Sequence, residues 1–102
     1  MKVNTDTTMM KATWNGQTIA ESDKTVEMDG FVYFPEETVK RRFLRASSTT
    51  ATDPTKGQAR YYSLQIDGLE TQDAAWYYPD PKPAARMLKH HIAFWRDVEV
   101  GS

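Results

Sequence analysis

The sequence contains no cysteine among its 102 residues. This absence excludes disulfide bridges, thiolate zinc sites and cysteine nucleophiles together. A long hydrophobic run is also missing. The longest one, AAWYY at residues 74–78, is far shorter than the roughly 20 residues that a transmembrane helix needs. We therefore expect no membrane span and no membrane partner.

An excess of charge of one sign is missing as well. The 13 Lys and Arg residues stand against 14 Asp and Glu residues, which gives a formal net charge of -1. General nucleic-acid binding needs a basic excess that displaces counterions from the phosphates, so we predict no nucleic-acid partner. The first residues, MKVNTDTTMM, lack the apolar segment of a signal peptide. We therefore expect a cytoplasmic protein.

Glycine is scarce, and three of the 5 glycines directly follow Asn or Asp. These dipeptides are Asn15-Gly16, Asp29-Gly30 and Asp67-Gly68, and each is flanked by β-branched or aromatic residues. Asn-Gly and Asp-Gly accept the positive φ angles of two-residue hairpin turns. The pattern predicts a mainly β fold with antiparallel, hairpin-rich sheets. The length fits a single domain over residues 1–102.

Two segments alternate in the manner of half-buried strands. In YYSLQI, residues 61–66, the side chains of Tyr62, Leu64 and Ile66 are expected on one face. In DAAWYY, residues 73–78, we expect Ala74, Trp76 and Tyr78 to share a face opposite Ala75 and Tyr77.

Two short helices are predicted as a minor α component. Residues 35–46, PEETVKRRFLRA, begin with proline and acidic residues and end with basic ones, an order that complements the helix dipole. Val39 and Phe43 are spaced i, i+4 and would face the core. In residues 82–91, KPAARMLKHH, the stripe expected to face the core comprises Ala84, Met87, Leu88 and His91.

The remaining segments are assigned by composition. Residues 47–57, SSTTATDPTKG, are small and polar and predict a loop of about eleven residues, a length at which loops are often functional. Residues 93–100, AFWRDVEV, predict a last strand with Phe94 and Trp95 on opposite faces.

Five motifs carry a resemblance to a known family: TWNGQTIAES, YFP, KGQARYY, AAWYYPDPKPAA and IAFW, in this order. The chain resembles the family called domain of unknown function 427 over about residues 12–100. Residues 1–11 would then be an N-terminal extension or a first strand. The resemblance implies tent-like sheets similar to the topology of the Mss-four-like metal proteins. The family is sometimes labelled as a nucleotidyltransferase domain, which implies an enzyme acting on nucleotides.

The chain departs from the family pattern at one motif. Members of the family commonly carry Cys-Pro-aromatic-Lys-Gly before the long strand, whereas this chain has Asp53-Pro54-Thr55-Lys56-Gly57. Thiol chemistry at this motif is therefore excluded here. The missing aromatic residue would widen, or make more polar, whatever this segment covers.

The stretch DAAWYYPDPKPAA, residues 73–85, is the first candidate site, and it has two interpretations. In one, Trp76 and Tyr78 are core residues and the three prolines form a stiff connector. In the other, that stiff backbone holds polar groups at the rim of an aromatic pocket. The residues predicted to bind a ligand are Tyr33, Lys56, Tyr61, Trp76, Tyr78, Asp80 and Lys82.

The motif TKGQARYY is the second candidate. Gly57 would allow a close backbone approach, and Lys56 would offer a point charge to an anionic ligand. The alternative is a solvated lysine beside a turn glycine. In YFP, Tyr33 and Phe34 are expected on opposite faces, so that one lies in the core and the other lines the pocket.

Two further clusters have plainer interpretations. The basic cluster Lys40, Arg41, Arg42 and Arg45 is expected to be a solvated helix face, with a phosphate or partner contact as the alternative. His90 and His91 are adjacent and would point apart in a strand or a helix. We therefore predict no metal site and no cofactor. The Gly-Ser turn with a nearby Asp-x-Asp, known from nucleotidyltransferases, is not found here.

Three functions follow from these observations. The first is a binding module with an aromatic-lined pocket for a small ligand, which would be anionic if it contacts Lys56 and Lys82. The second is an enzyme acting on nucleotides. The third is a protein-interaction module that uses the basic cluster or a sheet edge. Because the short chain is rich in aromatic residues (12%), we also predict a homodimer.

Overall fold

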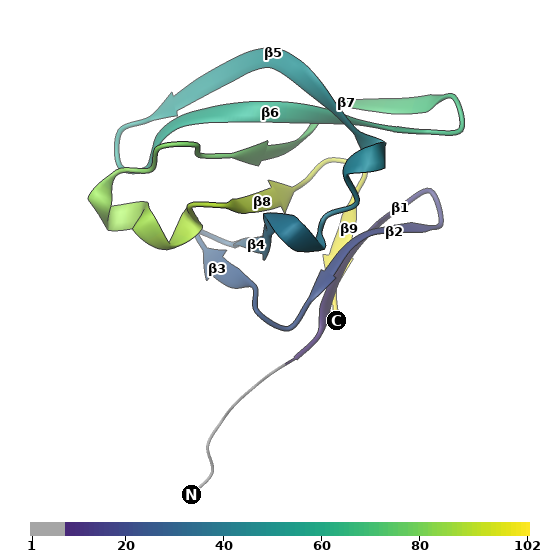
Figure 1. Cartoon of the computed structure of the whole chain (residues 1–102), viewed down its shortest axis with the longest axis horizontal. Helices are drawn as coiled ribbons and strands as arrows, with labels where there is room; N and C mark the ends of the chain where they lie inside the picture. The colour runs from purple at the N-terminus through teal and green to yellow at the C-terminus, as the bar shows by residue number, and fades with distance from the viewer. Residues whose placement is uncertain (1–7) are drawn as a thin grey trace, which may run out of the picture.

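The computed structural model describes residues 8–102 and shows two antiparallel sheets (Figure 1). The small sheet has the order β2-β1-β9, with β1 (Met10–Trp14), β2 (Gln17–Ser22) and β9 (Glu99–Gly101). The large sheet has the order β3-β4-β8-β7-β6-β5. Its strands are β3 (Val26–Met28), β4 (Phe31–Pro35), β5 (Leu44–Asp53), β6 (Gly57–Ile66), β7 (Leu69–Tyr77) and β8 (His91–Phe94).

The three predicted hairpin turns are confirmed. They join β1 to β2, β3 to β4 and β6 to β7, and every strand pair is antiparallel. At each turn the Asn or Asp residue has a φ between 49° and 54°, and the glycine after it has a φ between 77° and 84°. Two successive positive φ angles match the right-handed twist of the flanking strands. The mainly β fold follows from this local chemistry.

The short helices expected as a minor component are present, but they are 3-10 and not α-helical, and the first segment is divided into two. The described residues form 3-10 turns at these places: η1 (Glu36–Thr38), η2 (Arg41–Phe43) and η3 (Pro83–Leu88). Between η1 and η2, Val39 is extended and pairs with Ala20 of β2, so tertiary pairing interrupts the first helix. In η3, the backbone of Ala85 leaves the helical region.

The buried residues of the first segment were predicted correctly, whereas those of the second segment were predicted only in part. Val39 and Phe43 face the core, as expected, although no helix joins them. In the second segment only Leu88 of the predicted stripe is buried. Ala84 and Met87 are exposed, His91 is half-buried, and Ala85 is buried in their place.

The predicted loop at residues 47–57 is also wrong in its larger part. Residues up to Asp53 belong to β5, which pairs with β6 from Leu44 to Asp53 and contains a bulge between Ala46 and Thr50. Because β5 is an edge strand with mostly exposed side chains, its Ser and Thr residues reflect contact with water and not a lack of backbone pairing. The predicted last strand is split, since residues 95–98 connect β8 to β9.

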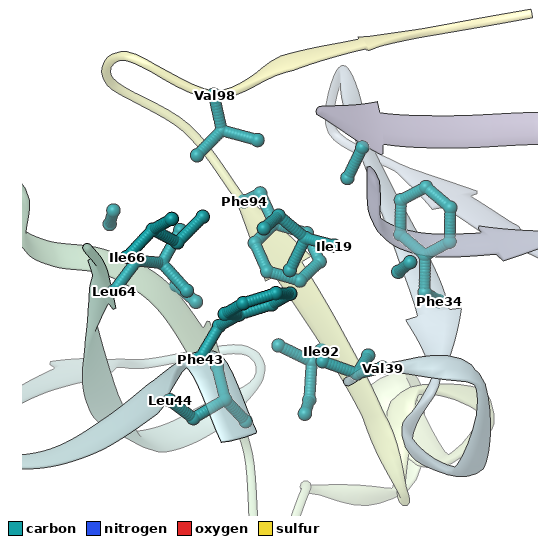
Figure 2. Packing of buried hydrophobic residues seen from close by; sticks show 14 residues of the cluster. Ile19, Phe34, Val39, Phe43, Leu44, Leu64, Ile66, Ile92, Phe94 and Val98 are labelled. Carbon is teal, nitrogen blue, oxygen red and sulfur yellow. The ribbon is translucent and has the colours of Figure 1, made fainter. Parts of the chain in front are cut away.

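The first hydrophobic cluster lies between the two sheets (Figure 2). Figure 2 shows Ile19 of the small sheet close to Phe94, with Leu64 and Ile66 of β6 approaching from the other side. Leu64, Ile66 and half-buried Tyr62 belong to this cluster, as their alternation predicted. This cluster is the main core of the protein.

A second cluster lies on the opposite face of the large sheet. It is formed by Tyr33, Ala59, Trp76, Tyr78 and Ala93 of the sheet region, with Ala85 and Leu88 of η3 packed against them. Strand alternation separates the two clusters, because Tyr33 is in the second and Phe34 in the first. The central strands of the large sheet are therefore covered on both faces.

One face assignment needs correction. Ala74 belongs to the first cluster together with Ala75, and not with Trp76 and Tyr78. The cause is a bulge at Asp73, whose φ is 52° and where the register of β6 and β7 shifts. A bulge inserts extra residues in one strand and breaks the alternation.

Candidate functional site

A row of side chains crosses four neighbouring strands on the face of the second cluster. Tyr33 of β4 pairs with Ala93 of β8, Ala93 pairs with Trp76 of β7, and Trp76 pairs with Tyr61 of β6. Directly paired residues point to the same side of a sheet. The small Ala93 between two large aromatic residues leaves room above the sheet.

A cavity of about 320 Å³ lies at this row. Its size is at the lower end of the range for small-molecule sites. The lining residues come from the β3–β4 hairpin, the β5–β6 turn, the central strands and the end of β8: Asp29, Phe31, Tyr33, Asp53, Lys56, Tyr61, Trp76, Tyr78 and Trp95. The cavity thus has aromatic walls and one charged end.

Trp76 is the central ring of the cavity. The ring centroids of Phe31 and Trp95 lie 4.9 Å and 5.4 Å from that of Trp76, with interplanar angles of 87° and 74°. Tyr33 and Tyr61 follow at 6.1 Å and 6.3 Å. Phe31, Tyr33 and Trp95 make favourable edge-to-face contacts with Trp76, whereas Tyr61 is tilted at 39°. The edge-to-face contacts hold these three rings at steep angles to the ring of Trp76.

The charged end is formed by a lysine between two carboxylates. Lys56 is only 8% exposed, and its ammonium group pairs with Asp29 and, at 3.4 Å, with Asp53. The hydrogen bond to Asp29 is the main reason that the pKa of Lys56 is raised to about 12, and Asp53 adds to it. The expectation of a solvated lysine is therefore wrong. Lys56 is buried and stays protonated at neutral pH.

Asp53 stands where the family pattern has cysteine, and its carboxylate has a structural role there. Its Oδ1 accepts hydrogen bonds from the backbone N–H groups of Thr55 at 2.8 Å and Lys56 at 2.9 Å. These bonds, that of Lys56 first, lower the pKa of Asp53. The carboxylate thus closes the β5–β6 turn and holds Lys56 toward the cavity.

Two phenols at the cavity floor are held in their neutral form. Burial raises the pKa of Tyr78 to about 12 and also raises the pKa of Tyr33. Hydrogen bonding from Trp76 acts against this shift at Tyr33. Since a phenolate would be costly here, both residues act at pH 7 as neutral donors or acceptors.

Five of the seven residues predicted to bind a ligand surround this one cavity: Tyr33, Lys56, Tyr61, Trp76 and Tyr78. Of Tyr33 and Phe34, the tyrosine lines the cavity and the phenylalanine lies in the core. Trp76 and Tyr78 are both buried and cavity-lining, so both interpretations of their stretch apply to them. Ligand binding itself stays a prediction.

The other two predicted residues lie outside the cavity. Asp80 lines a separate depression with Pro79 and Tyr77. The ammonium group of Lys82 donates to the carbonyl of Pro54 at 2.8 Å. Its backbone N–H donates to the backbone carbonyl of Lys56 at 2.9 Å. Residues 79–83 therefore brace the β5–β6 turn from outside.

Gly57 permits this brace, as the sequence suggested. A Cβ at Gly57 would lie 3.2 Å from the carbonyl oxygen of Asp80 and 3.6 Å from the backbone nitrogen of Lys82. Its φ of 111° is also unfavourable for residues with a side chain. The two backbones can approach only because residue 57 has no side chain.

Four lining residues were missed from the sequence: Asp29, Phe31, Asp53 and Trp95. Phe31 could have been found, because it stands two residues before Tyr33 in one strand and so shares its face. Trp95 gave no such signal, since it follows the end of β8. Its indole N–H donates to the carbonyl of Asp73 at 2.6 Å, which holds the ring against the cavity.

The basic cluster is solvated, but it is not a helix face. Lys40, Arg41, Arg42 and Arg45 are exposed. Arg41 lies 3.9 Å from Glu36, Arg42 stacks on Phe43, and Arg45 donates to backbone carbonyls.

The adjacent histidines take separate local contacts. His90 lies 3.6 Å from Glu36, and His91 is bonded to the carbonyl of Lys89 at 2.8 Å. Within residues 8–102, no group of three or more His, Asp or Glu side chains is arranged to hold a metal ion. No helix in that range is long and apolar enough to cross a membrane.

The comparisons with known proteins define the class of this domain. The family model described as "Domain of unknown function (DUF427)" matches residues 2–101, nearly the whole chain. The chain belongs to this family, as the five motifs indicated. The name of the family model carries the nucleotidyltransferase label mentioned above. A comparison with curated proteins gives no match. The predicted N-terminal extension or first strand at residues 1–11 falls largely outside the described residues; β1 begins at Met10.

Proposed function

We propose that this protein binds a small organic molecule in the aromatic cavity on the outer face of its large sheet. The observation that carries this proposal is the arrangement around Trp76, where five other aromatic side chains line a cavity of about 320 Å³. Aromatic walls with few fixed polar groups are typical of small-molecule sites. Phe31 and Trp95, each 36% exposed, give a ligand access to this interior.

The protonation states of the cavity favour binding over acid–base catalysis. Lys56 has a pKa of about 12 and Tyr78 also has a pKa of about 12. A general base or acid works best with a pKa near the operating pH. At pH 7 Lys56 is a fixed cation and Tyr78 a neutral hydroxyl. The nucleotide-acting enzyme and the protein-interaction module remain predictions from the sequence.

A cytoplasmic homodimer is part of the same proposal. The aromatic residues at the cavity mouth, Phe31 and Trp95, are large and partly exposed, and such residues are enriched at interfaces. Contact between two copies at this mouth would bury them and close the cavity over a ligand that is already bound. The cytoplasmic location itself stays a prediction from the sequence.

The test uses the three tryptophans of the chain as reporters. Trp76 and Trp95 line the cavity, whereas Trp14 lies in β1 beside the first cluster. In ¹H–¹⁵N spectra recorded with mixtures of small organic fragments, binders should shift the indole signals of Trp76 and Trp95 and leave that of Trp14 in place. Two results would contradict the proposal. In one, the fragments shift all three indole signals equally; in the other, no fragment shifts the signals of Trp76 and Trp95.

A matched pair of variants completes the test. Phe31 and Leu69 both directly follow an Asp-Gly turn and both are exposed, but only Phe31 lines the cavity. We expect Phe31→Ala to weaken fragment binding by up to about tenfold, because an aromatic contact contributes about 0.5 to 1.5 kcal/mol. Leu69→Ala should bind as the unaltered protein does. Equal loss in both variants would indicate a general effect on the fold.

A further inference from the structure

Building on the proposed function, we infer that the ligand carries an alkylated ammonium group, which lies among the aromatic rings and beside Asp29. The class of ligand follows from three properties of the cavity: its charge balance, one carboxylate oxygen that is not engaged, and the orientation of its rings.

The charge balance of the cavity is negative. Its charged lining residues are Asp29, Asp53 and Lys56, two carboxylates against one ammonium, which leaves one negative charge. Lys56 is engaged with both carboxylates. An anionic ligand would therefore meet a lysine whose charge is already compensated, and it would approach two carboxylates. A cation would instead be attracted by the net charge.

The two carboxylates are not equally available. Asp53 uses Oδ1 for two backbone N–H groups and Oδ2 for Lys56. Asp29 contacts Lys56 through Oδ2 alone, and within residues 8–102 its Oδ1 has no protein partner. The Asp29 side chain is 62% exposed. Its free oxygen thus offers a negative charge that a bound cation can approach.

The rings supply the remaining contact. Phe31 and Trp95 stand at 87° and 74° to Trp76, so ring surfaces surround the cavity on more than one side. Ring faces attract cations, and aromatic boxes with an acid at one side recognise quaternary ammonium groups. An alkylated ammonium suits these walls better than a bare one, because its methyl groups bury apolar surface and need no hydrogen-bond acceptors.

The experiment compares two molecules of nearly the same shape. Choline and 3,3-dimethylbutan-1-ol differ in having N⁺ or carbon at the branched centre. In titrations followed by the indole signals of Trp76 and Trp95, choline should bind at least about tenfold more tightly than the neutral alcohol. A peptide with a trimethyllysine side chain presents the same head group from a protein source. Its affinity relative to choline shows whether the cavity takes a free or a peptide-borne ammonium.

Matched variants test the role of Asp29. Asp29 and Asp67 occupy the same place in two equivalent Asp-Gly turns, with φ values of 54° and 49°. Asparagine tolerates this conformation as well as aspartate does, so both turns should survive. Asp29→Asn should weaken choline binding by about 5- to 10-fold and leave the alcohol unaffected. Asp67→Asn removes the same charge far from the cavity and should change neither affinity.

The outcomes separate this inference from the proposed function. If choline and the alcohol bind equally, or if Asp67→Asn weakens choline as much as Asp29→Asn does, the ammonium inference is wrong while the cavity remains a binding site. If neither molecule binds while other fragments shift Trp76 and Trp95, the inference is again wrong and the proposed function stands. If no fragment of any charge binds, both fail.

Discussion

At the scale of single residues, Lys56 couples the candidate site to the stability of the fold. It is nearly buried and paired with Asp29 and Asp53, and its pKa is raised to about 12. The pKa of Tyr78 is raised to about 12 by burial, and that of Tyr33 is raised as well. All three residues therefore hold their protons more tightly in the folded state than in the unfolded chain.

These shifts predict a loss of stability in alkaline solution. Because the folded state binds more protons, the free energy of unfolding should be fully retained below about pH 10 and fall as the pH rises to about 12. Urea unfolding followed by tryptophan fluorescence at several pH values measures this fall. Tyr78→Phe removes one of the titrating groups and should make the fall shallower. A stability that does not change from pH 9 to pH 12 would contradict the assigned shifts.

Some residues of the cavity could be predicted from the sequence and others could not, and the difference has a physical reason. Tyr33, Tyr61 and Trp76 could be assigned to one surface because alternation along a strand is a local property. The burial of Lys56 could not, since it depends on Asp29, which lies 27 positions earlier and meets Lys56 only in the folded chain. A lysine surrounded by small polar residues looks solvated until its partners are known.

At the scale of elements, the β5–β6 turn is held by the proline-rich segment that follows β7. The backbone of Asp80 and Lys82 passes so close to Gly57 that a Cβ there would be crowded. The ammonium group of Lys82 also donates a hydrogen bond to the carbonyl of Pro54. This contact joins two segments that both adjoin the cavity, because Lys56 directly precedes Gly57 and Tyr78 directly precedes the proline-rich segment, and both residues line the cavity.

Gly57→Ala should therefore destabilise the protein by about 1 to 3 kcal/mol, from backbone strain and from the crowded Cβ together. Gly68→Ala is the matched control, because Gly68 also has a positive φ, of 83°, but nothing lies within 4 Å of its added Cβ. Thermal unfolding of both variants measures the difference. If Gly68→Ala proves as damaging as Gly57→Ala, the close approach of the two backbones contributes nothing of its own.

The bulge at Asp73 ties three elements to the wall of the cavity. Its carboxylate accepts hydrogen bonds from Ser47 at 2.6 Å and Thr49 at 2.8 Å, both in β5. Its backbone N–H donates to Ser63 of β6, and its carbonyl accepts the indole N–H of Trp95. One residue with a positive φ thus fixes the edge strand and the position of Trp95.

Asp73→Ala should lower the free energy of unfolding by about 1 to 3 kcal/mol, because two charge-assisted hydrogen bonds are lost and alanine is disfavoured at this φ. Asp73→Asn keeps the favoured backbone and one acceptor oxygen, so a smaller loss is expected. Chemical unfolding measures both, and the indole signal of Trp95 should move more in the alanine variant. If both variants are as stable as the unaltered protein, the carboxylate is not what holds the bulge.

The elements were predictable where local chemistry decides, and not where distant pairing does. The Asn-Gly and Asp-Gly turns fix their own conformation, so the hairpins could be read from the sequence. The helix expected across Val39 fails because that residue pairs with Ala20. The polar composition of β5 predicted a loop. The segment is a strand because it pairs with β6 at the edge of the sheet, and composition does not reveal this pairing.

At the scale of the whole molecule, the predicted homodimer is open to a direct measurement. Native mass spectrometry of the gently purified protein should show twice the 11.7 kDa of the chain, and a retained ligand would add a discrete mass. If the mouth of the cavity forms the contact, Trp95→Ser should shift the spectrum toward the monomer, because an exposed aromatic contact would be lost. A spectrum with only the monomer mass at micromolar concentration would refute the dimer.

The two covered faces of the large sheet have a consequence for how such a domain can change over time. Along β4 and β8, alternate positions serve different tasks: Phe34, Ile92 and Phe94 hold the sheets together, whereas Tyr33 and Ala93 shape the cavity. A substitution at one set leaves the packing of the other largely untouched. Exchanges at every second residue of the same strands can therefore reshape the cavity, while the packing between the two sheets is retained.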